Sequence, residues 1–346
     1  MERIVIGRTG LEAYRVGLGG IPIQRVSESQ AVETVLHAVQ RGVDFIDTSR
    51  AYTTSERRIG LALKQTDKRV VLASKSHTRT AQDIRADLGI SLKELQRDFI
   101  DLYQCHFVKD ETEYREVVSP GGALEGLRKA KEEGLIGHIG ITSHNLDVLD
   151  RSLDDGLFDT IMVCFSFLEP LAREKIIPKA LAKNVGVIAM KPFSGGVIED
   201  ARLALKYALS HPGLLVIPGV EDKDLFEENW KVFQDGQPLT EREQKEIAEI
   251  QKRYEKVFCR RCDYCQPCTE EIPIQVILGV RSMVKRMGQR VLRGGRHREA
   301  IDKARNCTAC GACKERCPYQ LPIPDLIEEN LHWVDEQLKS SESPAA

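Results

Sequence analysis

The sequence has no run of eighteen or more apolar residues, so we expect no segment that spans a membrane. Its formal net charge of −2 provides no general attraction to nucleic acid or anionic lipid, and we expect neither as a partner. The chain opens Met-Glu-Arg-Ile without an apolar leader, which predicts a reducing, cytoplasmic location. No flavin motif is visible, and Gly17-Leu18-Gly19-Gly20 lacks the GxGxxG spacing of a Rossmann domain.

Cysteine, by contrast, is concentrated near the end of the chain. Eight of the 10 cysteines form two runs of four, and Pro318 directly follows the second run. That run has gaps of two, two and three residues, the pattern of bacterial ferredoxins that hold [4Fe–4S] clusters, while the first has two residues in every gap. The runs are Cys259, Cys262, Cys265 and Cys268, and Cys307, Cys310, Cys313 and Cys317.

These runs resemble those of two-cluster ferredoxins, in which the fourth cysteine of a run ligates the other cluster. We therefore hypothesise one cluster on the first three cysteines of the first run plus Cys317, and another on the first three of the second run plus Cys268. Two zinc sites are an alternative, although zinc ribbons usually separate their CxxC pairs by a longer loop. The first run also departs from the pattern, because Thr269 stands where the second has Pro318.

From Arg281 to Arg305, the spacer between the two runs is strongly basic, with Glu299 and Asp302 as the acids of that stretch. Apolar residues recur in it at helical spacing from Ile277 to Val291, which predicts an amphipathic helix that ends at Gly294-Gly295. Three interpretations stay open: a packed helix whose charge offsets the clusters, a docking face for an acidic electron carrier, or contact with a membrane surface or nucleic acid.

Over the first 240 residues, short apolar runs alternate about eight times with amphipathic segments. Such units predict parallel strands with right-handed crossovers, and eight of them favour a (β/α)8 TIM barrel in the α/β class. We expect the barrel over residues 1–238, a connecting helix over 239–258 with Thr240 and Glu243 as its capping box, and a mainly α-helical ferredoxin-like domain over 259–340. The expected strands are Val16–Gly20, Asp44–Thr48, Val70–Lys75, Ile100–Phe107, Gly137–Thr142, Thr160–Phe165, Val185–Lys191 and Leu214–Val220.

Reactive groups of such barrels lie at the carboxyl ends of the strands. There the sequence has Asp47, Tyr52, Lys75 and His106, a plausible set for proton transfer. A free phenol with a pKa near ~10 is a poor acid at neutral pH, and a nearby ammonium lowers that pKa. A carboxylate can hold the ammonium in place, and a histidine can orient a carbonyl oxygen.

Several segments around these residues resemble the aldo-keto reductase family, over roughly residues 2–235. The resemblance implies that Asp47, Tyr52, Lys75 and His106 are the catalytic tetrad, with Tyr52 as proton donor, and that a nicotinamide cofactor crosses the barrel mouth. The cysteine-rich tail is similar to that of the iron–sulfur branch of the family. The matching segments are Asp47–Gly60, Leu72–Lys75, Asp101–His106, His138–His144 and Ile217–Asn229.

The implied cofactor contacts match less completely. Thr142-Ser143 stands where typical members carry Ser-Asn, Met162 where they carry Gln, and Met190 where a Tyr stacks on the nicotinamide. The basic residues that usually hold the 2′-phosphate of NADP correspond to Gly219 and Leu225. The best remaining polar candidates are Lys191 and Asn229.

We therefore expect an oxidoreductase that reduces a small carbonyl or oxidises an alcohol, coupled to one-electron transfer through two [4Fe–4S] clusters. Its expected cofactors are these clusters and NAD(P)H, and its expected partner is a ferredoxin or flavodoxin-type electron carrier. Two alternatives stay open: a flavin-dependent variant of the barrel, and a non-catalytic electron-transfer or interaction subunit.

Overall fold

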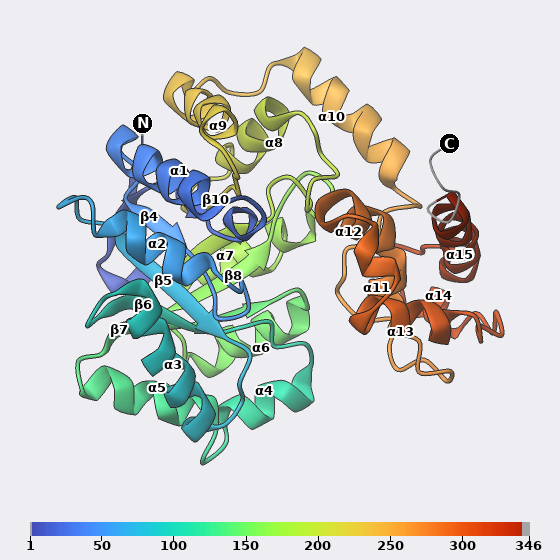
Figure 1. Ribbon diagram of the computed structural model, residues 1–346, viewed down its shortest axis with the longest axis horizontal. Coiled ribbons are helices and arrows are strands. Elements are labelled where there is room, and N and C mark those ends of the chain that lie inside the picture. Colours follow the sequence, from blue (N-terminus) through green and yellow to red (C-terminus); the bar gives the residue numbers. More distant parts are fainter. Residues whose placement is uncertain (1, 341–346) are drawn as a thin grey trace. The chain divides into compact units, whose positions relative to one another are not determined.

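The computed structural model describes residues 2–340. The chain divides into two compact units, with the boundary between Gln244 and Lys245. Figure 1 shows the ribbon of each unit.

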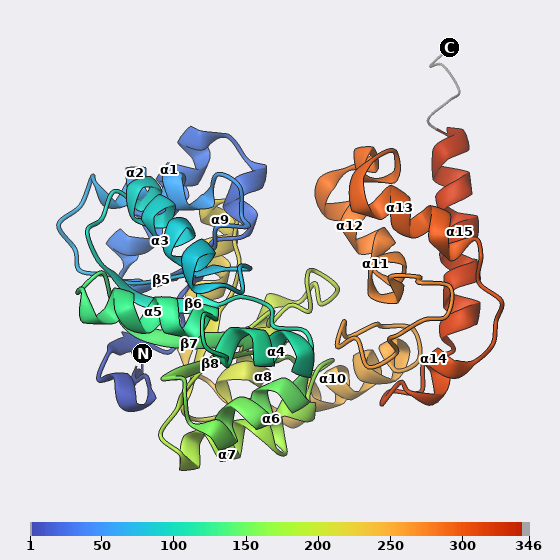
Figure 2. The same cartoon turned by 90° about the horizontal axis from the view of Figure 1, so that it is seen from below.

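The first unit is built on a parallel eight-stranded sheet in the order β3 to β10 along the chain. Backbone hydrogen bonds from Gly17 N to Val216 O and from Gly19 N to Pro218 O, both 2.9 Å, join the first and last strands. The predicted (β/α)8 barrel and all eight predicted strands are therefore confirmed (Figures 1 and 2). The strands are β3 (Leu18–Gly19), β4 (Phe45–Asp47), β5 (Val71–Ser76), β6 (Ile100–Cys105), β7 (Ile136–Ser143), β8 (Thr160–Cys164), β9 (Gly186–Met190) and β10 (Leu214–Ile217).

Helices surround this sheet, and most begin at a capping side chain. Ser27 and Thr80, for example, accept hydrogen bonds from backbone N–H groups of the first turns of α1 and α3. Helix α4, capped by Asp110, was not predicted. The helices are α1 (Glu28–Arg41), α2 (Ser55–Leu63), α3 (Ala81–Leu95), α4 (Glu111–Val118), α5 (Ala123–Glu132), α6 (Leu146–Asp155), α7 (Ile176–Ala182), α8 (Ala201–Leu209) and α9 (Lys223–Asp235).

An N-terminal hairpin, also not predicted, closes the amino end of the barrel. Its strands β1 (Arg3–Val5) and β2 (Glu12–Tyr14) pair antiparallel. Ile6 and Ala13 are buried in the same apolar cluster as strand residues such as Phe45. The carboxyl ends of the strands are consequently the end at which a site can form.

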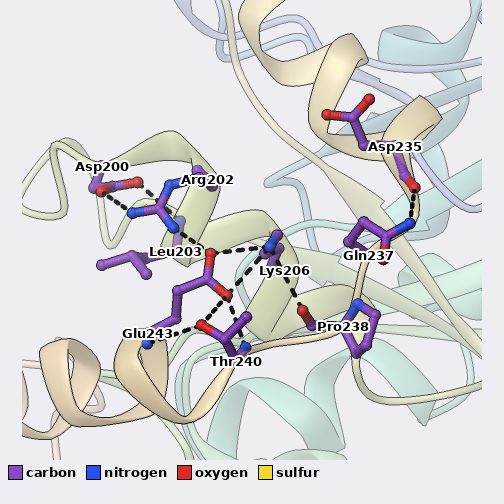
Figure 3. Close-up of polar contacts among 9 residues, drawn as sticks. All are labelled: Asp200, Arg202, Leu203, Lys206, Asp235, Gln237, Pro238, Thr240 and Glu243. Atoms are coloured by element: carbon purple, nitrogen blue, oxygen red, sulfur yellow. Dashed lines mark hydrogen bonds and ion pairs between the residues drawn. The ribbon is translucent and has the colours of Figure 1, made fainter.

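The connecting helix α10 (Glu241–Tyr254) begins with the predicted capping box (Figure 3). Thr240 N donates to Glu243 Oε2 over 2.8 Å, and Glu243 N donates to Thr240 Oγ1 over 3.2 Å. The Glu243 carboxylate also pairs with Arg202 and, over 2.9 Å, with Lys206, both on α8. The backbone hydrogen bond from Thr240 and the nearby cations lower the pKa of Glu243 to about 2.

The second unit is mainly α-helical, with a core around residues such as Ile277, Ile301 and Val334. Its long helix α15 packs on α11, α13 and α14 (Figures 1 and 2). The single amphipathic helix predicted for the spacer is wrong: Gly279 and Gly288 interrupt it, and Gly295 begins a helix instead of following one. The helices are α11 (Ile274–Leu278), α12 (Val280–Met287), a 3-10 turn Gln289–Leu292, α13 (Gly295–Ala304), α14 (Ala312–Glu315) and α15 (Ile323–Ser340).

None of the helices that the structure describes has the length and apolar character needed to cross a membrane.

Candidate functional site

Neighbouring strand ends of the barrel bring the four predicted catalytic side chains together. Asp47 ends β4, Lys75 lies one residue before the end of β5, and His106 directly follows β6. Tyr52 lies in the loop between β4 and α2. The parallel pairing of these strands is what aligns their carboxyl ends.

Lys75 is the centre of this arrangement, with a side chain only 1% exposed. Its ammonium is hydrogen-bonded to the Asp47 carboxylate and donates to Thr48 O over 2.7 Å. It also lies over the Tyr52 ring, whose centroid is 4.9 Å from Nζ. Gln104 Nε2 donates to the other Asp47 oxygen over 3.3 Å. One buried cation therefore links the carboxylate to the phenol.

Burial decides the direction in which the phenol titrates. Removal from water raises the pKa of Tyr52, and this outweighs the lowering effect of Lys75. The effect of Lys75 on the pKa of Tyr52 thus has the expected sign, and burial is the larger effect. Burial likewise raises the pKa of Asp47, and this outweighs the lowering effect of Lys75. Burial disfavours the Lys75 ammonium, but Asp47 and Tyr52 reverse this and raise its pKa.

His106 is held between three neighbours. Its ring stacks on His77 with centroids 4.0 Å apart and meets the Tyr52 ring edge-on at 5.8 Å. Ser49 Oγ lies 3.0 Å from His106 Nδ1 and also contacts Lys75 O over 3.1 Å. Burial, together with nearby cations, lowers the pKa of His106 well below its usual value and that of His77 to about 4. Both imidazoles are therefore neutral at pH 7.

Sequence reasoning missed Ser49, His77 and Gln104. Ser49 lies two residues beyond the predicted site residue Asp47, and His77 lies two residues beyond Lys75. Alternation along an extended chain would have indicated His77, because residues two apart share a face. Gln104, in the middle of a buried strand, carried a weaker signal: an amide among apolar residues needs a partner.

The residues proposed for the cofactor lie at other strand ends and on α9. Thr142 Oγ1 accepts from Phe107 N over 2.7 Å, and Ser143 Oγ donates to Val108 O over 2.6 Å. Met190 ends β9 and packs against the interior cluster, in which Met162 is 1% exposed. The hydroxyls of Thr142 and Ser143 are thus already engaged within the barrel.

Two further candidates lie around the same end of the barrel, and a third lies on α9. Lys191 Nζ is 2.8 Å from His144 Nε2. Gly219 bridges to Gly19, and a Cβ on it would approach Pro22 Cγ to 2.7 Å, so the backbone passes close here. Asn229 lies on α9 and is 5% exposed.

Comparison with known proteins agrees with the barrel fold. The family model described as "Aldo/keto reductase family" matches residues 15–202. The chain belongs to the aldo/keto reductase family. It is 31% identical over 219 residues to L-galactose dehydrogenase of Arabidopsis thaliana, covering 58% of this chain and 68% of that protein. It is 30% identical over 218 residues to aldo-keto reductase YhdN of Bacillus subtilis, covering 57% of this chain and 64% of that protein.

Solved aldo-keto reductases have the same fold as this family member. A putative aldo-keto reductase from Pseudomonas aeruginosa matches with a TM-score of 0.60 at 25% identity, over 68% of this chain and 94% of that one. An aldo/keto reductase from Klebsiella pneumoniae, in complex with NADP and acetate, matches with a TM-score of 0.61 at 21% identity. The match covers 72% of this chain and 95% of that one. The family match ends before the cysteine-rich unit of this aldo/keto reductase.

In that unit, Cys317 lies near Cys259 and Cys262 of the first run. It interacts electrostatically with Cys259 and Cys262, and Cys265 interacts with the same two residues. Cys265 and Cys317 are each 8% exposed. Burial raises the pKa of Cys259 to about 11 and that of Cys262 to about 12, so these thiols are protonated when no metal is bound.

The remaining four cysteines surround one pocket, which has an empty volume of about 380 Å³ including its open mouth. Ile272, Ile274 and Ile327 complete its apolar wall. Among residues 2–340, no three His, Cys, Asp or Glu side chains converge closely enough to hold a single metal ion. The cysteines of the pocket are Cys268, Cys307, Cys310 and Cys313.

Proposed function

We propose that this aldo/keto reductase interconverts a small carbonyl compound and its alcohol, with Tyr52 as general acid and base. We further propose that it exchanges single electrons through two [4Fe–4S] clusters in the second unit. The observation that supports the first proposal is the buried Lys75, which is hydrogen-bonded to Asp47 and lies over the Tyr52 ring, 4.9 Å from its centroid.

In the reducing direction, the Tyr52 hydroxyl gives its proton to the carbonyl oxygen. The Lys75 ammonium stabilises the phenolate that remains, and Asp47 keeps the ammonium charged and in place. His106, neutral at pH 7, orients the carbonyl oxygen by a hydrogen bond. In the oxidising direction, the Tyr52 phenolate takes the proton from the alcohol.

A nicotinamide cofactor would supply the hydride when bound. The residues of the chain fit it in part: the Lys191 cation lies at a strand end beside His144 and suits a diphosphate. The engaged hydroxyls of Thr142 and Ser143 fit the carboxamide clasp less well.

At the start of α9, Glu221, Asp222 and Asp224 accompany Lys223, which pairs with Glu33 over 2.5 Å. So much negative charge opposes a 2′-phosphate, and we expect NADH to be used in preference to NADPH.

The cysteines fit two clusters, which would supply one-electron transfer. Cys259, Cys262, Cys265 and Cys317 would hold one, and the four cysteines of the pocket would hold the other. The support for this arrangement is that each set combines residues from both runs, as in two-cluster ferredoxins.

The decisive experiment for the barrel compares Tyr52→Phe with Tyr103→Phe, which changes a buried tyrosine of strand β6. Anaerobic turnover of a panel of small aldehydes and ketones would be measured with NADH, NADPH and reduced flavin. We expect Tyr52→Phe to lower turnover at least ~100-fold at unchanged melting temperature and iron content, and Tyr103→Phe to retain it. Unchanged turnover in Tyr52→Phe would overturn the assigned role. If the clusters can be reduced but no donor supports turnover, the protein is a non-catalytic electron-transfer subunit. If reduced flavin is the only donor that supports turnover, the barrel is flavin-dependent.

The cluster proposal has its own measurement. Anaerobically purified protein should contain about eight iron and eight sulfide per chain and show [4Fe–4S] signals by EPR after reduction. Cys313→Ser should lower the iron content, whereas Cys105→Ser, in the barrel strand β6, should not. Stoichiometric zinc without sulfide would refute the proposal.

A further inference from the structure

Gln104 places an amide inside the barrel, next to the catalytic side chains. It lies on β6 two residues after Leu102, a member of the apolar interior cluster, so the two side chains share the inward face of the strand. Both residues are completely buried. In the register of β5 and β6, Gln104 is paired with Lys75. The amide and the catalytic ammonium are therefore neighbours in one row across the barrel wall.

The Gln104 amide forms a single side-chain hydrogen bond within residues 2–340, from Nε2 to Asp47 Oδ1 over 3.3 Å. Its Oε1 is buried without a hydrogen-bond partner in the same range of residues. Thr160 Oγ1, across Gly140 in the same row, is likewise unpaired with any described residue. A buried amide with one half unpaired is less favourable than an apolar side chain of the same size. The bond to Asp47 is therefore what Gln104 provides that an apolar residue would not.

This bond completes the donors around the Asp47 carboxylate. Lys75 is hydrogen-bonded to Oδ2, and Gln104 is hydrogen-bonded to Oδ1. Burial raises the pKa of Asp47, and Lys75 and Gln104 both oppose this, because N–H donors stabilise the ionised carboxylate. Tyr52 is the other titratable group coupled to Asp47. Strand β3, on the other side of β4, carries no titratable residue.

From this arrangement we infer that Gln104 is a positioning residue of the catalytic centre, whose amide keeps Asp47 ionised and directed at Lys75. The inference rests on the proposed role of Tyr52 as general acid and base, and it deepens that role. Asp47 keeps the Lys75 ammonium charged, and the ammonium stabilises the Tyr52 phenolate. Gln104 thus acts through Asp47 and transfers no proton itself.

The test measures the pH dependence of kcat for carbonyl reduction by the complete protein, with whichever donor supports turnover. Protonation of Asp47 removes the counter-ion of Lys75, so a change in the pKa of Asp47 moves the acid limb of the profile. Gln104→Met removes the donor at nearly the same side-chain length, and Gln104→Glu places a second acid beside Asp47. Thr160→Val removes a buried hydroxyl from the same row at nearly the same volume and is the control. Circular dichroism first establishes that each variant is folded.

We expect Gln104→Met to move the acid limb to higher pH by at least ~0.5 unit. Gln104→Glu should move it further, because a like charge raises a carboxyl pKa more than the loss of one hydrogen bond does. Thr160→Val should leave it in place. If neither Gln104 variant moves the limb, or if Thr160→Val moves it as far, the inference is wrong while the proposed function stands. If Tyr52→Phe turns over at the rate of the unaltered protein, the proposed function fails, and this inference fails with it.

Discussion

The ion pair of Lys75 and Asp47 supports both stability and catalysis, and substitution can separate the two contributions. Replacing Lys75 with Met removes the ammonium and leaves a carboxylate that is 2% exposed without its cation. Breaking a buried pair in this way costs about 3–5 kcal/mol of unfolding free energy. We expect Lys75→Met to lose that amount at pH 8, and Asp47→Asn/Lys75→Met to regain at least about 2 kcal/mol, because it buries no charge.

The pH dependence has a defined sign. Without Lys75, burial raises the folded-state pKa of Asp47 further above its unfolded value near ~4. A carboxyl group with a raised pKa destabilises the folded state as pH rises through that pKa. The loss of unfolding free energy in Lys75→Met should therefore become smaller as pH falls from 8 to 5. The double variant should not show this pH dependence.

Urea unfolding followed by tryptophan fluorescence measures these differences in the barrel. The chain has 2 tryptophans, Trp230 in the barrel helix α9 and Trp333 in α15. A Trp333→Phe background therefore makes the signal report on the first unit. Lys64→Met, at an exposed lysine after α2, is the control. Equal stability of Lys75→Met and this control, or no recovery in the double variant, would refute the reasoning.

Three further outcomes are expected. Glu243→Gln should lose about 1–2 kcal/mol of stability at pH 7, whereas Glu249→Gln should not. Because the folded-state pKa of Glu243 is lowered to about 2, that loss should diminish as pH falls below 4.5, and a constant loss would contradict the charge-based explanation. His77 should titrate by NMR with a midpoint at pH about 4, and a midpoint near its ordinary value would show that burial does not control it. Ser49→Ala should lower kcat about tenfold through the lost hydrogen bond to His106, with Tm unchanged; an unaltered kcat would exclude Ser49 from positioning that ring.

Local patterns were sufficient for most of the secondary structure. All eight strands of the barrel were predicted, because short apolar runs separated by amphipathic segments have few other solutions. The capping box of Thr240 and Glu243 was also predicted and confirmed, since both partners lie within one turn of the same helix. The spacer helix was mispredicted where Gly279 and Gly288 interrupt an otherwise regular apolar pattern.

The sequence by itself determined the barrel, the strand ends at which Asp47, Tyr52, Lys75 and His106 lie, and the clustering of cysteines near the end of the chain. These follow from periodicity and spacing, which are local properties of a chain. Only the tertiary structure decided that burial raises the pKa of Tyr52 despite Lys75, and that Ser49 and His77 hold His106. The grouping of Cys268 with Cys307 was already a hypothesis from the sequence, whereas the exposure of Cys310 at the edge of their pocket came only from the tertiary structure. Desolvation and contacts between distant residues depend on how the elements pack, and no local pattern encodes that packing.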